Sequence, residues 1–150
     1  MLLKIILFKF GPVSLMTLIE QAKNTFEHPD IIINRWKWAN LVPLDTITQS
    51  FGLQLSMSQF MNLYGNIAIF IPTGILISLM VKKRWSLSIL ISFGISLMLE
   101  SLQLVLAMGS FDVDDLILNT AGGMIGAGIV VIGTVVIRRL FRFGKVQEAG

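Results

Sequence analysis

Glu100 and Gln103 stand inside a long apolar run, and a short loop later three aspartates and an asparagine follow. An ionisable side chain within a membrane span is costly, and it usually faces the interior of a helix bundle or a cavity. A buried carboxylate of this kind suits general acid–base chemistry. The sequence therefore makes Glu100 the first catalytic candidate, and the polar residues after it are candidates for the same site: Asp112, Asp114, Asp115 and Asn119.

The composition is typical of a membrane protein. The 150 residues are 54% hydrophobic and 14% charged, with a mean hydropathy of +0.77, whereas soluble domains carry about 25% charged residues. The net charge is +3, but most of the basic residues flank apolar runs, where they act as topology signals. We therefore expect no nucleic-acid partner. The absence of cysteine excludes thiolate catalysis, and the single histidine, His28, cannot form a multi-histidine metal site.

Three apolar segments are long enough to cross a membrane as helices: 61–81, 85–106 and 116–137. Each has about 20 residues, which at about 1.5 Å per residue matches a hydrocarbon core of about 30 Å. The sequence thus predicts an all-α, polytopic membrane helical bundle that occupies residues 1–150 as one domain.

The first 60 residues are less apolar. Segment 1–19 is marginal as a further span, because two lysines and the Gly11-Pro12 pair interrupt it. Segment 20–60 is polar enough to lie outside the hydrocarbon. Within it, Arg35-Trp36-Lys37-Trp38 is typical of a chain at the level of lipid head groups. Stacking on nucleic acid is the alternative, and the lack of a surrounding basic domain disfavours it.

Basic residues predict the orientation. Lys82-Lys83-Arg84 joins the first two spans, and the basic tail 138–150 follows the third, so both are expected in the cytoplasm. The loop 107–115, which has no basic residue, and segment 20–60 are then expected outside.

Polar residues occur at a similar depth in all three spans. Asn66 lies about 7 Å inside the outer end of its span, Glu100 lies six residues before the end of the next, and Asn119 lies three residues after Leu116. Residues three or four apart share a helix face, as in the pairs Asn62/Asn66, Glu100/Gln103 and Asp115/Asn119. We expect one outward-facing pocket that contains Asn66, Glu100, Gln103 and Asn119.

Each polar group also has a structural alternative. Asn66 and Asn119 can hydrogen-bond between helices, and the three aspartates can cap a helix or stabilise its first turn. Small residues predict close helix packing, with Gly122-x-x-x-Gly126 on the third span and a serine face on the second: Ser88, Ser92 and Ser96.

Several motifs of the chain, in a fixed order, are similar to those of a known family. They are Asn40-Leu41-Val42-Pro43 with Thr46-Ile47, Gly65-Asn66 with Phe70-Ile71-Pro72-Thr73-Gly74, Glu100-Ser101-Leu102-Gln103, and Phe111-Asp112-Val113-Asp114-Asp115 with Asn119-Thr120-Ala121-Gly122-Gly123. Together they resemble the VanZ-like family of small bacterial inner-membrane proteins, which is named for a member that gives low-level teicoplanin resistance.

The resemblance implies a multi-pass protein of the bacterial cytoplasmic membrane that modifies or hydrolyses a lipid head group at the outer leaflet. We expect membrane lipids or lipid-linked precursors as partners, while the cofactor and the oligomeric state stay open. Glu100 is then the general acid/base, with Asp112 and Asp115 on the phosphate side or at a divalent cation, although the spacing demands no metal. The expected substrate-binding residues are Asn66, Gln103, Asp114, Asn119 and Arg35.

The chain departs from its relatives at two places. Many relatives carry an arginine just before the Phe-Asp motif, where this chain has Gly109-Ser110. If that arginine binds phosphate, substrate capture here is expected to use another cation, such as Arg35 or Lys37. Relatives also have a full apolar helix ahead of the segment that matches 7–10, so the first helix is expected to be shortened, truly or through a misplaced start.

Two other functions stay open. A non-enzymatic protein that shields lipid-linked cell-wall precursors from antibiotic is the main alternative. A small ion-coupled transporter is disfavoured, because no polar residue continues the path through the inner half of the membrane.

Overall fold

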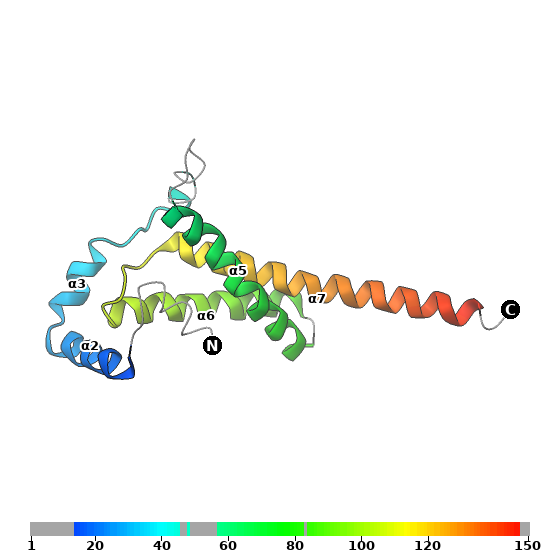
Figure 1. Cartoon of the computed structure of the whole chain (residues 1–150), viewed down its shortest axis with the longest axis horizontal. Helices are drawn as coiled ribbons and strands as arrows, with labels where there is room; N and C mark the ends of the chain where they lie inside the picture. The colour runs from blue at the N-terminus through cyan, green and yellow to red at the C-terminus, as the bar shows by residue number, and fades with distance from the viewer. Residues whose placement is uncertain (1–13, 46–47, 49–56, 83, 148–150) are drawn as a thin grey trace.

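The computed structural model describes residues 14–45, 48, 57–82 and 84–147, and it is helical almost throughout (Figure 1). Its helices are α2 (Leu15–Glu27), α3 (Asp30–Trp36), α5 (Met57–Met80), α6 (Trp85–Val105) and α7 (Val113–Gln147). Three stretches are long and apolar enough to cross a membrane: Gln59–Met80, Trp85–Val105 and Val113–Arg139. The prediction of an all-α protein with three candidate membrane-spanning helices is confirmed. The marginal first span falls mostly outside the described residues.

Helices α5 and α7 approach each other through glycine. A Cβ added to Gly122 would collide with the carbonyl oxygen of Ile67, and one added to Gly126 would collide with that of Ile71. Gly74 of α5 likewise faces the backbone of Gly123. Side chains at these positions would force the two helices apart. The close packing that the Gly122-x-x-x-Gly126 spacing predicts is therefore present, and it sets the register between α5 and α7.

Helix α6 meets α7 through its serine face. Ser88, Ser92 and Ser96 are fully buried, and the Oγ of Ser92 occupies the space that a side chain at Gly123 would need. The hydroxyl of Ser88 donates to the carbonyl oxygen of Arg84 at 3.0 Å, so its proton is used within α6. The predicted contact between the serine face and the glycine-rich helix is confirmed.

The expected interfacial segment contains two short helices, which lie near one end of α6 (Figure 1). Helix α2 is capped by Ser14, whose hydroxyl oxygen accepts the N–H of Thr17 at 3.1 Å. Its exposed side presents an apolar stripe of Leu15, Ile19 and Phe26, beside the charged residues Glu20, Lys23 and Glu27. An amphipathic helix of this kind is typical of a membrane–water interface.

Helix α7 is longer than the predicted span. It continues to Gln147, and its C-terminal half extends beyond α5 and α6 (Figure 1). At the other end of α7, residues 106–112 join the C-terminus of α6 to the N-terminus of α7. We call this part of the molecule the loop end.

Candidate functional site

The segment 40–44 crosses the start of α7 at the loop end. Asn40 forms an isolated parallel bridge with Asp112: its backbone N–H donates to the carbonyl oxygen of Phe111 at 2.9 Å, and its own carbonyl oxygen accepts the N–H of Val113 at 3.0 Å. Its side-chain amide also donates to Oδ1 of Asp112 at 3.0 Å. Residues that are 72 positions apart in the chain are thereby joined at the N-terminus of α7.

Asp112 caps α7. Its Oδ1 accepts the backbone N–H of Asp114 at 2.8 Å, which is the bond that an N-cap side chain makes. Burial raises the pKa of Asp112, and the charges of Asp115 and Asp114 add to the rise, while the hydrogen bonds from Asp114 and Asn40 oppose it. The capping alternative for this aspartate is thus realised in the structure, by a carboxyl group whose pKa is raised.

Glu100 is buried, with 2% of its surface exposed. Its Oε2 accepts the backbone N–H of Asp112 at 3.3 Å, so the carboxylate of α6 lies at the N-terminal end of α7. The positive end of a helix dipole stabilises a negative charge there. One helix therefore supplies the acid and the next helix supplies a partner that makes its burial tolerable.

Gln103 is buried one turn further along α6. Its main-chain carbonyl oxygen accepts the N–H groups of Met108 at 2.9 Å and Gly109 at 3.3 Å. These bonds turn the chain out of α6, and Ala107 takes a positive φ of 54° at the same point. Gln103 thus shapes the loop end through its backbone.

Asp115 joins α7 to α5. Its Oδ1 accepts the side-chain amides of Asn62 at 2.9 Å and Asn66 at 2.5 Å. Asn62 and Asn66 are four residues apart, so one face of α5 brings both amides to one oxygen. This polar contact is closer to the N-termini of α5 and α7 than the glycine contacts that join the same two helices.

Asp114 is bound by the crossing segment. It has no exposed surface, and its Oδ1 accepts the backbone N–H of Leu44 at 2.5 Å. Leu44 has a φ of 70°, a left-handed conformation that a leucine rarely adopts. Strain of this kind persists where the surrounding structure fixes it, and here the carboxylate of Asp114 contributes to that.

Asn119 lies one turn deeper and contacts α6. Its side-chain amide donates to the hydroxyl oxygen of Ser96 at 3.0 Å, and both residues are buried. The predicted polar residues therefore gather around the first two turns of α7, where hydrogen bonds join Glu100 to Asp112, Asn66 to Asp115, and Asn119 to Ser96.

Arg35 brings a positive charge to the loop end. Its Nη1 donates to the carbonyl oxygen of Gly109 at 3.0 Å, and the neighbouring Trp36 ring lies 5.8 Å from that of Phe111. The guanidinium thus lies beside Gly109, two residues before the Phe111-Asp112 motif. Lys37, the other candidate cation, is exposed and donates to Asn34 within its own segment.

Metal binding finds no support in this arrangement. Within the described residues, no three His, Cys, Asp or Glu side chains form a group that could hold a metal ion.

The side chains of Asn40 and Asn62 bond to the aspartates of the site, although neither was among the expected site residues. Asn62 carried a usable signal, since its spacing from Asn66 placed it on the same face of α5. Asn40 carried only its place in the Asn40-Leu41-Val42-Pro43 motif, because an irregular segment has no periodicity to read.

The fold and the polar loop end define a polytopic helical membrane protein whose acidic and amide groups surround the start of its last helix. The family model for VanZ/LLP1 matches residues 1–137, so the chain belongs to that family. Searches of curated proteins and of solved structures found no match.

Proposed function

We propose that this protein binds a lipid-linked head group of the bacterial cell envelope at the loop end and modifies or hydrolyses it. The observation that carries the proposal is the burial of Glu100 in an apolar span, with its Oε2 accepting the N–H of Asp112. A carboxylate in this position is costly and is usually kept for function. In hydrolysis, Glu100 takes a proton from the attacking water as that water adds to the phosphoryl group.

Asp112 supports the same chemistry as a proton donor. Because burial raises its pKa, it holds a proton at a higher pH than an ordinary aspartate. It can then protonate the oxygen that leaves the lipid head group while Glu100 accepts the proton from water. Two carboxyl groups with opposite roles are a common way to run acid–base chemistry near neutral pH.

Arg35 is the proposed phosphate-binding cation. A guanidinium has five N–H donors, and the bond to Gly109 engages one of them. Planar bidentate recognition of phosphate is the usual reason for an arginine at such a site. The remaining expected residues, Asn66, Gln103, Asp114, Asp115 and Asn119, act by holding the loop end in shape around the head group.

The proposed orientation places the loop end outside the cytoplasmic membrane and the tail after α7 inside, following the basic residues. Helices α2 and α3 then lie at the level of the outer head groups. The exposed apolar and aromatic side chains of these helices and of the residues just after α3 include Phe26, Ile33, Trp36 and Trp38. This position brings Arg35 to the lipid surface from which the substrate comes.

A non-enzymatic shielding protein is the second candidate. It is favoured by the hydrogen bonds of the three aspartates, each of which already binds another part of the protein: Asp112 binds Asn40, Asp114 binds Leu44, and Asp115 binds Asn62 and Asn66. Such contacts suit a rigid binding surface. In that case the loop end covers a lipid-linked precursor and lowers the access of a glycopeptide such as teicoplanin.

An assay with purified protein separates the two functions. The protein is reconstituted in vesicles that contain envelope phospholipids and a lipid-linked cell-wall precursor, both labelled in the head group. Release or alteration of the label in proportion to protein supports the enzyme. Unchanged label together with reduced glycopeptide binding to the vesicles supports shielding. If the label stays unchanged and glycopeptide binding is not reduced, both functions are rejected.

A further inference from the structure

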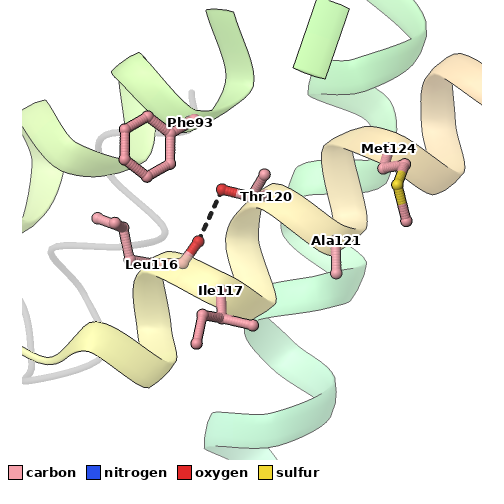
Figure 2. A pocket seen from close by; sticks show the side chains of 6 residues that line it. All are labelled: Phe93, Leu116, Ile117, Thr120, Ala121 and Met124. Carbon is pink, nitrogen blue, oxygen red and sulfur yellow. Dashed lines mark hydrogen bonds between the residues drawn. The ribbon is translucent and has the colours of Figure 1, made fainter. Parts of the chain in front are cut away.

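An apolar groove opens between α6 and α7 (Figure 2). It has a volume of about 300 Å³ and is lined by Phe93 of α6 and by five residues of α7: Leu116, Ile117, Thr120, Ala121 and Met124. Figure 2 shows the Phe93 ring facing Leu116 and Thr120 across the gap. The volume lies at the lower end of the range for ligand pockets, about 300–1,000 Å³.

The lining favours a hydrocarbon ligand. Thr120 is the only lining residue with a polar side chain, and its hydroxyl donates to the carbonyl oxygen of Leu116 at 2.7 Å. Its proton is therefore used within α7. The groove also belongs to helices that are apolar and long enough to cross a membrane, so lipid chains are the medium that surrounds it.

The groove lies on the same two helices as the polar pair Glu100 and Asp112, near the start of α7. Phe93 lies seven residues before Glu100, which is two helical turns or about 10 Å along the same face of α6. Leu116 lies four residues after Asp112, and its N–H donates to the carbonyl oxygen of Asp112 at 3.3 Å. Since Glu100 and Asp112 are themselves hydrogen-bonded, the polar pair lies about one turn of α7 before Leu116, the first residue of α7 that lines the groove. A polar end followed by an apolar groove matches a lipid head group followed by its chain.

We infer that the groove holds one acyl chain of the lipid whose head group is bound at Glu100 and Asp112. The inference rests on the proposed function and narrows its substrate to a chain-bearing lipid that enters sideways from the bilayer between α6 and α7. A water-soluble head group without an acyl chain is therefore not a substrate, because it would leave the groove empty.

Photolabelling tests the occupant. The full chain is placed in phosphatidylglycerol vesicles that contain phosphatidylglycerol with a diazirine midway along one acyl chain. After illumination, labelled residues are mapped by mass spectrometry. We expect several-fold more label on Phe93 and Met124 than on Leu76 and Ile132, which are at least as exposed but lie outside the groove. Equal labelling of all four residues would overturn the inference.

A variant that fills the groove provides the second test. Ala121→Phe should remove most of the label from Phe93 and Met124, whereas Ile132→Phe, the same kind of addition outside the groove, should leave it unchanged. If Ala121→Phe does not fold, Ala121→Leu serves with a smaller loss. Unchanged groove label in a folded variant, or a cross-link from the groove to a second copy of the chain in place of lipid, would contradict the inference.

The two proposals fail in different ways. Loss of head-group turnover in Glu100→Gln with the groove label retained supports both. Labelling of the groove without any turnover rejects the enzyme and keeps the chain site. If turnover depends on Glu100 but the photolabel shows no preference for groove residues, the enzymatic function is supported and the acyl-chain site is rejected.

Discussion

The Oε2 atom of Glu100 accepts the backbone N–H of Asp112 at 3.3 Å, so a carboxylate in one apolar helix lies against the N-terminus of the next. Asp112 in turn caps α7 through its own side chain. Because the first N–H groups of a helix favour negative charge, α7 helps the chain to keep an acid in its second span.

Two effects of Asp112 on stability, its titration and its capping hydrogen bond to Asp114, can be measured separately. Its folded pKa lies above the ordinary value of 3.8, so the folded state binds the proton more tightly than the unfolded state. The contribution of Asp112 to stability is therefore greatest below the ordinary pKa, and it is lost as the pH rises through the raised value. Asp112→Asn keeps an oxygen acceptor for Asp114 and should be at least as stable as the wild type at neutral pH, with a smaller pH slope.

Thermal unfolding in detergent between about pH 4 and pH 7 measures this slope. Asp112→Ala is the matched control, since it removes both charge and cap and should cost about 1 kcal/mol. The interpretation fails if the asparagine and alanine variants are equally destabilised.

The bond between Asn66 and Asp115 should appear as a coupling energy. Alanine at position 66 removes one of the two amides that donate to Asp115, and alanine at position 115 removes an acceptor from the buried Asn66. Each change should cost about 1 kcal/mol, and the double variant should cost less than the sum. We expect a coupling of about 0.5–3 kcal/mol in a double-mutant cycle of unfolding free energies. Exposed Asn34, paired with Asp115 in a control cycle, should be additive. Additive changes in unfolding free energy for Asn66 and Asp115 would show that this contact does not stabilise the protein.

Two glycines of α7 should respond in opposite ways to alanine. A Cβ at Gly126 meets the backbone of Ile71 and Ile75, whereas a Cβ at Gly133 meets nothing within 4 Å. Gly126→Ala should destabilise the protein by about 1–3 kcal/mol, because overpacking moves a backbone. Gly133→Ala should be neutral or stabilise by up to about 1 kcal/mol through helix propensity. Unfolding by denaturant in micelles measures both, and equal effects would contradict the α5–α7 contact.

Topology can be tested with single cysteines, because the chain has none of its own. Ser110 is exposed at the loop end, and Lys82 is exposed at the opposite ends of α5 and α6. A membrane-impermeant thiol reagent added to whole cells should label Ser110→Cys and spare Lys82→Cys. The reverse pattern would place the loop end in the cytoplasm and reject the outer-leaflet substrate.

Much of the helical framework could be predicted from the sequence because it depends on local patterns. Apolar length indicated the three spans, and the spacing of Ser88, Ser92 and Ser96 predicted a small-residue face on α6, which does meet α7 at Gly123. Depth also placed Glu100 and Asp112 close to the same end of the bundle.

The partners of the polar residues could not be predicted in the same way. The bond of Asn66 to Asp115 joins residues 49 apart and depends on the register that the glycine contacts set. Asn40 contacts Asp112 from an irregular segment, where no period indicates which residues face the site. The short helix α3 likewise has only seven residues and packs against α6, so its place reflects tertiary contacts more than its own propensity.

The most direct test of the central claim is head-group turnover by the Glu100→Gln variant in vesicles, at matched protein levels. Glutamine keeps the shape of the side chain and an oxygen for the N–H of Asp112, but it cannot take up or release a proton near neutral pH. We predict a loss of about 10²- to 10⁴-fold with expression and thermal stability maintained, while Glu20→Gln, the same change at an exposed position of α2, keeps full turnover. Wild-type turnover in Glu100→Gln would contradict the acid–base role of Glu100.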